Sequence, residues 1–250
     1  MIDLNLLRLQ PNPQALATWA ASTGQRALLA DMGYAVHAAC KAVLGTAAPK
    51  PFYLRSSNGS QELIGYTNST ADDIQRAVQL SLATSDAAAA LGAASLVIKA
   101  MPNNWRVGER FSFETRVAPV LRSRAQEMGR YVEVDAAFHP QFSGQTPGDR
   151  PAAYQRWMQA ELAREGAAEL LTMRMHSFAL TGMARRNHAQ PGGQRHVVRG
   201  LLPDLCVRGE LRVLAPAAFH ALLARGLGRH RSFGFGCVLL APAGAMQQVA

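Results

Sequence analysis

The chain has 250 residues, of which 48% are hydrophobic and 17% are charged. This composition is typical of a folded globular protein and excludes a largely disordered chain. The net charge of +9 favours a polyanionic partner.

Nothing in the sequence indicates export or membrane insertion. No apolar run approaches the roughly 20 residues that a membrane helix needs. The start, Met1-Ile-Asp-Leu-Asn-Leu-Leu-Arg, lacks a basic region followed by an apolar stretch, so we expect no signal peptide and a cytoplasmic protein. Cys40, Cys206 and Cys237 are far apart and form no CxxC pair, so neither a disulfide framework nor a zinc site is expected.

The first hundred residues alternate between strand and helix patterns. Strands are predicted from alternating or β-branched and aromatic residues, and helices from apolar residues at helical spacing. Chain order gives a strand at 3–9, helices at 13–22 and 25–44, strands at 52–55 and 63–66, a helix at 70–90 and a strand at 95–101. This β-α-β-β-α-β order is that of the ferredoxin-like fold.

The same order recurs after Pro102-Asn-Asn-Trp105. We expect a strand at 110–117, an irregular basic stretch, a helix from about 149 to 165, strands within 170–183 and 196–213, a helix at 216–225 and a strand at 235–240. The sequence therefore predicts an α+β protein with tandem ferredoxin-like (RRM-like, RAMP) domains. Their expected limits are 1–101 and 108–250.

A glycine-rich segment, Gly226-Leu-Gly-Arg-His-Arg-Ser-Phe-Gly-Phe-Gly236, connects the last helix and strand. Glycines allow positive φ and a close backbone approach, and exposed amides beside guanidinium groups suit phosphate. The pattern is neither a Walker P-loop nor a dinucleotide fingerprint, because no Gly-Lys-Ser/Thr follows and a strand, not a helix, comes next. Two interpretations stay open at this point: a phosphate clamp, or a tight helix-to-strand turn with solvated arginines.

This segment resembles the C-terminal glycine-rich loop of the CRISPR-associated endoribonucleases that cut precursor CRISPR RNA. The E-type subfamily, CasE, typically has Gly-Ile-Gly-Arg-x-Lys-Ala-Phe-Gly-x-Gly-Leu-Leu there. Weaker matches are Pro51-Phe-Tyr-Leu-Arg55, Phe111-Ser-Phe-Glu-Thr-Arg-Val-Ala-Pro119, Tyr154-Gln-Arg-Trp157 and Val207–Leu214. The resemblance implies two ferredoxin-like domains and metal-independent cleavage of the repeat hairpin, with no cofactor. It also implies 2′,3′-cyclic phosphate and 5′-hydroxyl products, and retention of the mature crRNA.

The motif Tyr34-Ala-Val-His37 carries the candidate chemistry. Spacing i, i+3 puts both side chains on one helix face, and histidine is suited to proton transfer near neutral pH. In the resembled family a Tyr-x-x-His of the first domain occupies the active site. This implies His37 as general acid or base, Tyr34 as its partner, and Lys41 or Arg26 as a stabiliser of the phosphorane. The alternative is a helix with a half-buried tyrosine and a structural histidine.

Arginines are expected to hold the RNA backbone. Between residues 171 and 250 there are ten Arg and no Lys, against Asp204 and Glu210 alone. The proposed RNA contacts are Arg55, Arg116, Arg122, Arg124, Arg130, Arg185, Arg186, Arg195, Arg225, Gly226, Gly228, Arg229, His230, Arg231, Gly234 and Gly236. His188 and His196 lack carboxylate or cysteine partners at useful spacing, so no metal site is expected there.

Three departures leave alternatives open. Arg231 stands where the family usually has Lys, Ala118 stands where it usually has Asn, and the mid-chain basic stretch has few Lys. A type IV CRISPR RNA-processing nuclease, with arginines doing the work and His37 a bystander, is one alternative. A non-catalytic crRNA-binding subunit is the main rival, and a nucleotide-binding metabolic enzyme is a distant one. CRISPR repeat RNA and other subunits of a CRISPR effector complex are the expected partners, without a membrane.

Overall fold

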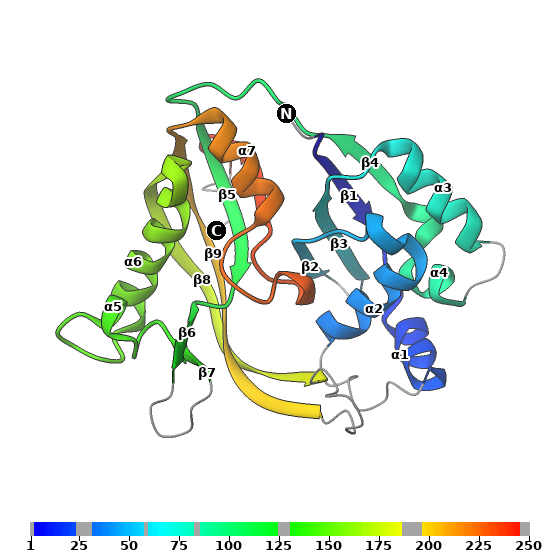
Figure 1. Cartoon of the computed structure of the whole chain (residues 1–250), viewed down its shortest axis with the longest axis horizontal. Helices are drawn as coiled ribbons and strands as arrows, with labels where there is room; N and C mark the ends of the chain where they lie inside the picture. The colour runs from blue at the N-terminus through cyan, green and yellow to red at the C-terminus, as the bar shows by residue number, and fades with distance from the viewer. Residues whose placement is uncertain are drawn as a thin grey trace. The chain divides into compact units, whose positions relative to one another are not determined.

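A computed structural model describes residues 3–23, 32–57, 60–82, 86–124, 131–186 and 197–245. Figure 1 shows the course of the chain. Its internal contacts divide it into two compact units: unit 1 contains Met1–Pro102, Thr181–Leu201 and Arg231–Gly234, and unit 2 contains Asn103–Leu180, Leu202–His230 and Phe235–Ala250. The domain limits expected from the sequence stay a prediction.

Unit 1 contains a four-stranded antiparallel sheet in the order β2-β3-β1-β4. Its strands are β1 (Asn5–Leu9), β2 (Phe52–Ser57), β3 (Ser60–Thr67) and β4 (Val97–Ala100). The helices α1 (Pro13–Ser22) and α2 (Met32–Leu44) precede β2, and α3 (Ala71–Leu82) and α4 (Asp86–Leu91) precede β4. This topology is the predicted ferredoxin-like fold.

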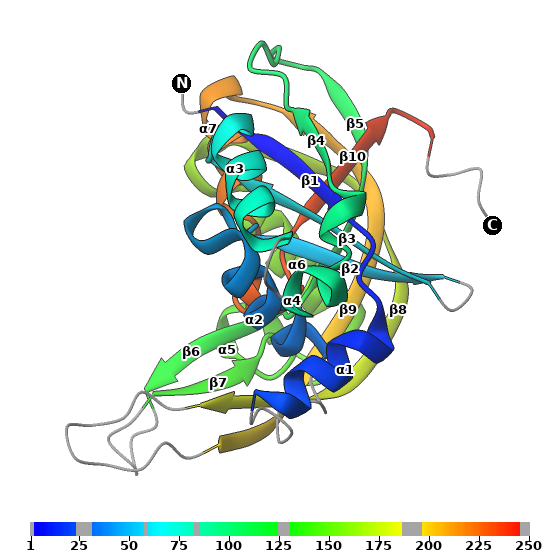
Figure 2. The ribbon, with the colours of Figure 1, turned by 90° about the vertical axis from the view of Figure 1, so that its right-hand side faces the viewer.

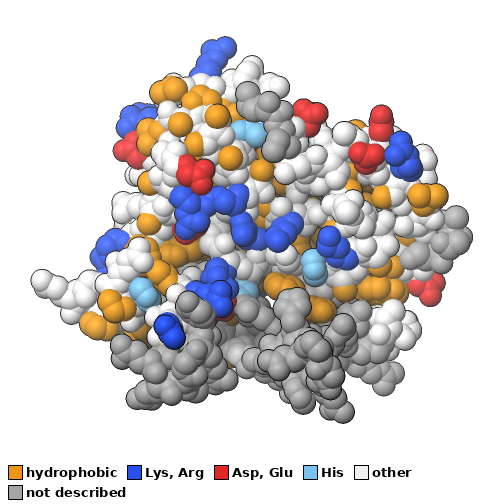
Figure 3. Space-filling view, in the orientation of Figure 1, with side chains coloured by type: hydrophobic (Ala, Val, Ile, Leu, Met, Phe, Trp, Pro, Cys, Tyr) orange, Lys and Arg blue, Asp and Glu red, His pale blue; other side chains and the backbone are white. Residues whose placement is uncertain are grey.

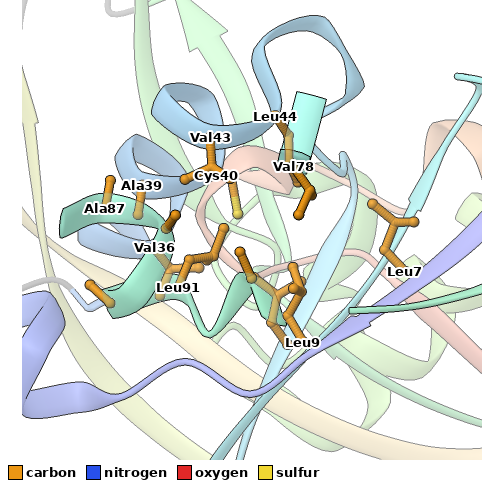
Figure 4. Packing of buried hydrophobic residues seen from close by; sticks show 14 of the residues in the cluster. Leu7, Leu9, Val36, Ala39, Cys40, Val43, Leu44, Val78, Ala87 and Leu91 are labelled. Atoms are coloured by element: carbon orange, nitrogen blue, oxygen red, sulfur yellow. The ribbon is translucent and has the colours of Figure 1, made fainter. Parts of the chain in front are cut away.

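The core of unit 1 lies between this sheet and its helices. Along α2, Val36, Ala39, Cys40 and Val43 recur at helical spacing and are fully buried or nearly so, and Leu7 and Leu9 of β1 alternate toward them. Figure 4 shows these side chains pointing toward one another. Burying one such aliphatic side chain contributes about 1.5–3 kcal/mol, so this packing fixes which side of α2 stays accessible.

Unit 2 repeats the topology with the sheet order β10-β5-β9-β8. The strands of this sheet are β5 (Arg110–Val117), β8 (Ala168–Arg186), β9 (Val197–Val213) and β10 (Val238–Pro242). The part of β8 from Thr181 onward and the part of β9 up to Leu201 are assigned to unit 1. Helix α6 (Arg150–Ala163) precedes β8 and helix α7 (Pro216–Arg225) precedes β10. Figure 2 shows β8 and β9 running side by side as a long curved ribbon. The predicted second ferredoxin-like fold is therefore confirmed.

The sequence predicted an irregular stretch after β5, and this prediction was wrong. The stretch forms the antiparallel hairpin of β6 (Val120–Arg124) and β7 (Tyr131–Asp135), followed by the one-turn helix α5 (Pro140–Ser143). Each strand is only five residues long, which gives little alternation to detect. Short 3-10 helices are η2 (Gly45–Ala47), η3 (Ala93–Ser95), η4 (Arg164–Gly166) and η5 (Arg231–Phe233). None of the helices in the described ranges is long and apolar enough to cross a membrane.

Candidate functional site

An aromatic cluster in unit 1 joins the predicted catalytic pair to the glycine-rich segment. The rings of Tyr34 and Phe233 stack with centroids 5.6 Å apart and planes 9° apart. The His37 ring meets the edge of Phe233 at 5.5 Å and lies 6.5 Å from Tyr34. All three side chains are partly exposed. Phe233 therefore holds both members of the pair in place while leaving them accessible to a ligand.

His37 is tuned toward its neutral form. Partial burial, followed by the positive charges of Lys41 and Lys50, lowers the pKa of His37 below its ordinary value. A neutral imidazole at physiological pH is a proton acceptor, so the cluster can supply a general base.

Lys41 lies one turn beyond His37 on α2. Its ammonium Nζ donates to the carbonyl of Gly45 at 3.1 Å, which stabilises the carboxyl end of that helix. Arg26, the other predicted stabiliser of the phosphorane, lies outside the described residues. Arg231 belongs to η5 together with Phe233 and is a further cation of this unit.

The backbone of the glycine-rich segment is hydrogen-bonded within the protein. The amides of Gly226, Leu227 and Gly236 donate to the carbonyls of Leu222, Gly236 and Arg116 at 2.7, 2.9 and 2.6 Å. The amide of Gly228 donates to Glu161 Oε2 at 2.9 Å. These four amides serve the turn, so anion binding by the segment has to use other groups.

Positive φ explains the glycines of this segment. Gly226, Gly228, Gly234 and Gly236 have φ between 62° and 88°. Gly228 also lies against the ring of Trp157, where a Cβ would come within 2.8 Å. Both observations agree with the structural interpretation of the glycines, and RNA contacts by these residues stay a prediction.

Two predicted phosphate ligands of the segment share one carboxylate in unit 2. Glu133 of β7 accepts from Arg229 Nε at 2.7 Å and lies 2.9 Å from His230 Nε2. The imidazole of His230 is almost fully buried, so it is not positioned on the surface. Arg225 and Arg231 are partly exposed. Figure 3 shows Lys and Arg side chains gathered over the part of this face where Figure 1 places the segment after α7.

The predicted mid-chain arginines have different environments. Arg116 forms a two-pronged ion pair with Asp204, at 2.8 and 2.6 Å, and its guanidinium lies 4.4 Å from the ring centroid of Phe235. This is a packing role inside unit 2. Arg122 and Arg124, by contrast, are exposed on β6, and Arg130 lies outside the described residues.

The remaining predicted contacts are less informative. Arg55 of β2 lies over the ring of Tyr53, 5.8 Å from its centroid, beside a surface hollow lined by Gln10, Asn12 and Gln61. Arg195 and the side chains of Arg185 and Arg186 are outside the described part of the structure. Phe233 is the site residue that sequence reasoning missed, although it lies within the glycine-rich segment.

Two ferredoxin-like units, with a His-Tyr-Phe cluster in the first and exposed arginines in the second, define the class of tandem ferredoxin-like proteins. Comparison of the sequence with models of known protein families identifies the family. The family model described as CRISPR associated protein matches residues 4–242. The chain therefore belongs to this family of CRISPR-associated proteins.

Solved structures share the fold over nearly the whole chain. Cse3 of Thermus thermophilus, bound to an RNA representing a pre-cleavage complex, is 18% identical, with a TM-score of 0.58 over 96% of this chain and 100% of that one. Cas6e of Escherichia coli K-12 is 16% identical, with a TM-score of 0.51 over 96% and 99%. A chain of a CRISPR RNA-guided surveillance complex in a pre-nicking state is 15% identical, with a TM-score of 0.52 over 95% and 99%. No curated protein matches the sequence.

Proposed function

We propose that this protein is a CasE-type endoribonuclease that cuts precursor CRISPR RNA within the repeat hairpin and keeps the mature crRNA. The observation that carries the proposal is the half-buried His37, which meets Phe233 of the glycine-rich segment edge-on and whose pKa is lowered toward the neutral form. Support comes from the family to which the chain belongs and from the likeness to Cse3, whose structure holds an RNA.

The proposed reaction uses the 2′-hydroxyl of the RNA as nucleophile. The neutral imidazole of His37 takes the 2′-hydroxyl proton as the 2′-oxygen bonds to phosphorus, and the phenol of Tyr34 orients the scissile phosphate. The bond from phosphorus to the 5′-oxygen breaks, and that oxygen takes a proton from water. The hydroxide left behind takes the proton from His37, which restores the neutral imidazole. The products are a 2′,3′-cyclic phosphate and a 5′-hydroxyl, and no metal takes part.

Cations complete the proposed site. Arg231, in the same 3-10 helix as Phe233, stabilises the charge of the phosphorane, a role that Lys41 shares less directly because its ammonium also binds the end of α2. Arg122 and Arg124 contact phosphates of the stem, because both are exposed on the β6–β7 hairpin. Such contacts fix the position of the RNA rather than read its sequence.

After cleavage the protein stays on its product within a larger assembly. One of the structurally similar chains belongs to an RNA-guided surveillance complex, which supports this part of the proposal. We expect the protein to act in the cytoplasm, where such RNA is made.

The test is cleavage of a labelled repeat RNA in the presence of EDTA. The native protein should cut it and leave a 5′ fragment whose terminal phosphate resists phosphatase, as a cyclic phosphate does. His37→Ala should lose cleavage by about 100-fold or more, the contribution of a general base, while its affinity for the RNA changes only a few-fold. His176→Ala, which removes an exposed histidine of β8, is the matched control and should cut normally.

Two results would contradict the proposal. Tight binding without any cleavage by the native protein would favour the non-catalytic crRNA-binding subunit. Normal cleavage by His37→Ala would remove His37 from the chemistry and leave the arginine-based mechanism of a type IV enzyme.

A further inference from the structure

Two phenylalanines are exposed on unit 2. Phe138, which follows β7, is 52% exposed, and Phe178 of β8 is 38% exposed. The other large hydrophobic side chains exposed in the described ranges are aliphatic. Exposed aromatic rings that gather in one place are candidates for contact with a ligand.

One arginine joins these two rings. The guanidinium carbon of Arg150 lies 5.3 Å from the ring centroid of Phe138 and 5.1 Å from that of Phe178. We call Phe138, Arg150 and Phe178 the aromatic platform. Aromatic rings beside a guanidinium group form the kind of surface on which nucleobases stack.

Asp135 holds Arg150, the central residue of the aromatic platform, in place. Asp135, the last residue of β7, lies 3.4 Å from Arg150 Nε, accepts from the Tyr154 hydroxyl at 3.0 Å and accepts from the Ala137 amide at 2.9 Å. Burial and the neighbouring carboxylate raise the pKa of Tyr154, so its phenol stays protonated as a donor. Arg150 lies against both rings and the Tyr154 ring lies 6.1 Å from the Phe178 ring, so these fixed neighbours limit the movement of the rings and lower the entropic cost of binding.

Gly148 supports the same arrangement. A Cβ at this position would lie 3.3 Å from the Phe138 ring, and φ of Gly148 is +90°. A side chain at this position would therefore crowd the edge of the Phe138 ring, and glycine avoids this.

The aromatic platform lies next in the chain to the β6–β7 hairpin, which contacts RNA in the proposed function. The β6–β7 hairpin ends at Asp135, three residues before Phe138, and its strand β6 presents the exposed Arg122 and Arg124. Those arginines can bind phosphates of the RNA stem, whereas the rings can stack on a base that is not paired in that stem. A paired base in A-form RNA has its faces covered by its neighbours, so only an unpaired one can stack here.

We propose that the aromatic platform binds an unpaired nucleotide of the repeat RNA by stacking its base on Phe138 and Phe178. This inference rests on the proposed function, because it takes the RNA as the ligand. The positive charge of Arg122 and Arg124 on the adjoining hairpin favours this occupant over an apolar segment of a partner protein.

The experiment measures binding of two RNAs by His37→Ala protein, in which the RNA should remain intact. One RNA is the repeat hairpin with its unpaired loop and flanks, and the other is a blunt duplex of the same stem sequence. Phe138→Leu with Phe178→Leu keeps apolar bulk but removes both rings. This double variant should bind the hairpin on the order of 10-fold more weakly and the duplex within about 2-fold of the parent protein.

Controls separate stacking from folding and from general hydrophobicity. Leu80→Ala and Val107→Ala remove side chains that are each 71% exposed elsewhere on the chain, and both variants should bind like the parent protein. Phe138→Tyr with Phe178→Tyr restores the rings and should restore affinity. A 2-aminopurine placed at each unpaired position in turn should be quenched at one position by the parent protein and not by the Leu variant.

The failures are distinguishable. If the native protein cuts repeat RNA and the Leu variant binds both RNAs like its parent, the platform serves something other than RNA and the inference is wrong while the proposed function stands. If the native protein neither cuts nor binds the repeat, the proposed function fails first. Equal losses for hairpin and duplex would also overturn stacking, because they would indicate a general loss of affinity.

Discussion

Gly228→Ala is the substitution whose consequence can be worked out most fully from the structure. Gly228 has φ +62°, and a Cβ there would lie 2.8 Å from Trp157 Cζ2 and 2.9 Å from Trp157 Cη2. The indole is 2% exposed, so it cannot move into solvent to make room. The substitution therefore combines backbone strain with a steric clash.

The two costs can be estimated separately. An alanine in the left-handed region costs about 1–2 kcal/mol, and overpacking a filled core costs about 1–3 kcal/mol. Their sum lowers the free energy of unfolding by roughly 2–5 kcal/mol. At about 2–4 °C per kcal/mol for a chain of this size, the Tm should fall by roughly 4–20 °C.

Thermal unfolding followed by circular dichroism and calorimetry measures this effect, and two other glycines provide controls. Gly108 has φ +84° with no atom near its would-be Cβ, so Gly108→Ala should show the strain cost alone. Gly182, whose φ is not positive and whose would-be Cβ meets nothing within 4 Å, should tolerate Ala with little change. A Gly228→Ala protein that unfolds at the native Tm but no longer binds RNA would refute the reasoning, because the glycine would then serve a phosphate rather than Trp157.

Four further predictions concern charge and burial. The lowered pKa of His37 keeps its imidazole neutral as the pH falls. The acid limb of the pH profile of single-turnover cleavage should therefore lie below about pH 6.5, the ordinary pKa of histidine. An acid limb above that pH would contradict His37 as the general base. The same lowered pKa affects stability, because the unfolded chain binds the His37 proton more tightly than the folded chain does. Stability should therefore decrease as the pH falls through the ordinary pKa of histidine. His37→Ala should flatten the dependence of Tm on pH in that range. Arg116→Ala removes the two-pronged ion pair with the mostly buried Asp204 carboxylate and should cost about 3–5 kcal/mol in urea unfolding. Arg124→Ala on exposed β6 should stay within about 0.5 kcal/mol. Equal free energies of unfolding for the two variants would show that the Arg116 pair contributes nothing. Cys40 and Cys237 are buried, which raises the pKa of Cys40 to about 12 and also raises the pKa of Cys237. A thiol reagent should therefore label Cys206 first and the other two only on unfolding, and rapid labelling of all three would contradict the packing.

Local patterns in the sequence predicted most of the fold. The helix at 13–22 and the strand at 110–117 have the bounds of α1 and β5, because each carries its own periodicity and the helix also has Asn12 to cap its first turn. The β6–β7 hairpin was missed, since two five-residue strands stabilise each other only by pairing. One predicted helix at 70–90 corresponds to α3 and α4, with residues 83–85 outside the described ranges.

The candidate site was predictable only where it is local. Tyr34 and His37 are three residues apart on one helix, so their closeness follows from helical spacing. Phe233 comes from a segment far away in the sequence, and no pattern near Tyr34 predicts its contact with Tyr34 and His37. The pairing of Glu133 with Arg229 and His230 is equally non-local, and this is why groups expected to face phosphate were found bound to a carboxylate.

Those internal ion pairs change what the clustered arginines can offer to RNA. Arg208, Arg212 and Arg229 belong to the Arg-rich last third of the chain, but their partners Glu114, Glu169 and Glu133 come from earlier segments. An arginine that keeps its carboxylate displaces no counterion when the protein binds a phosphate. The logarithm of the RNA association constant should therefore fall less steeply with the logarithm of salt concentration than the ten arginines of residues 171–250 would imply. The slope of that plot then counts the arginines that the fold leaves for its ligand.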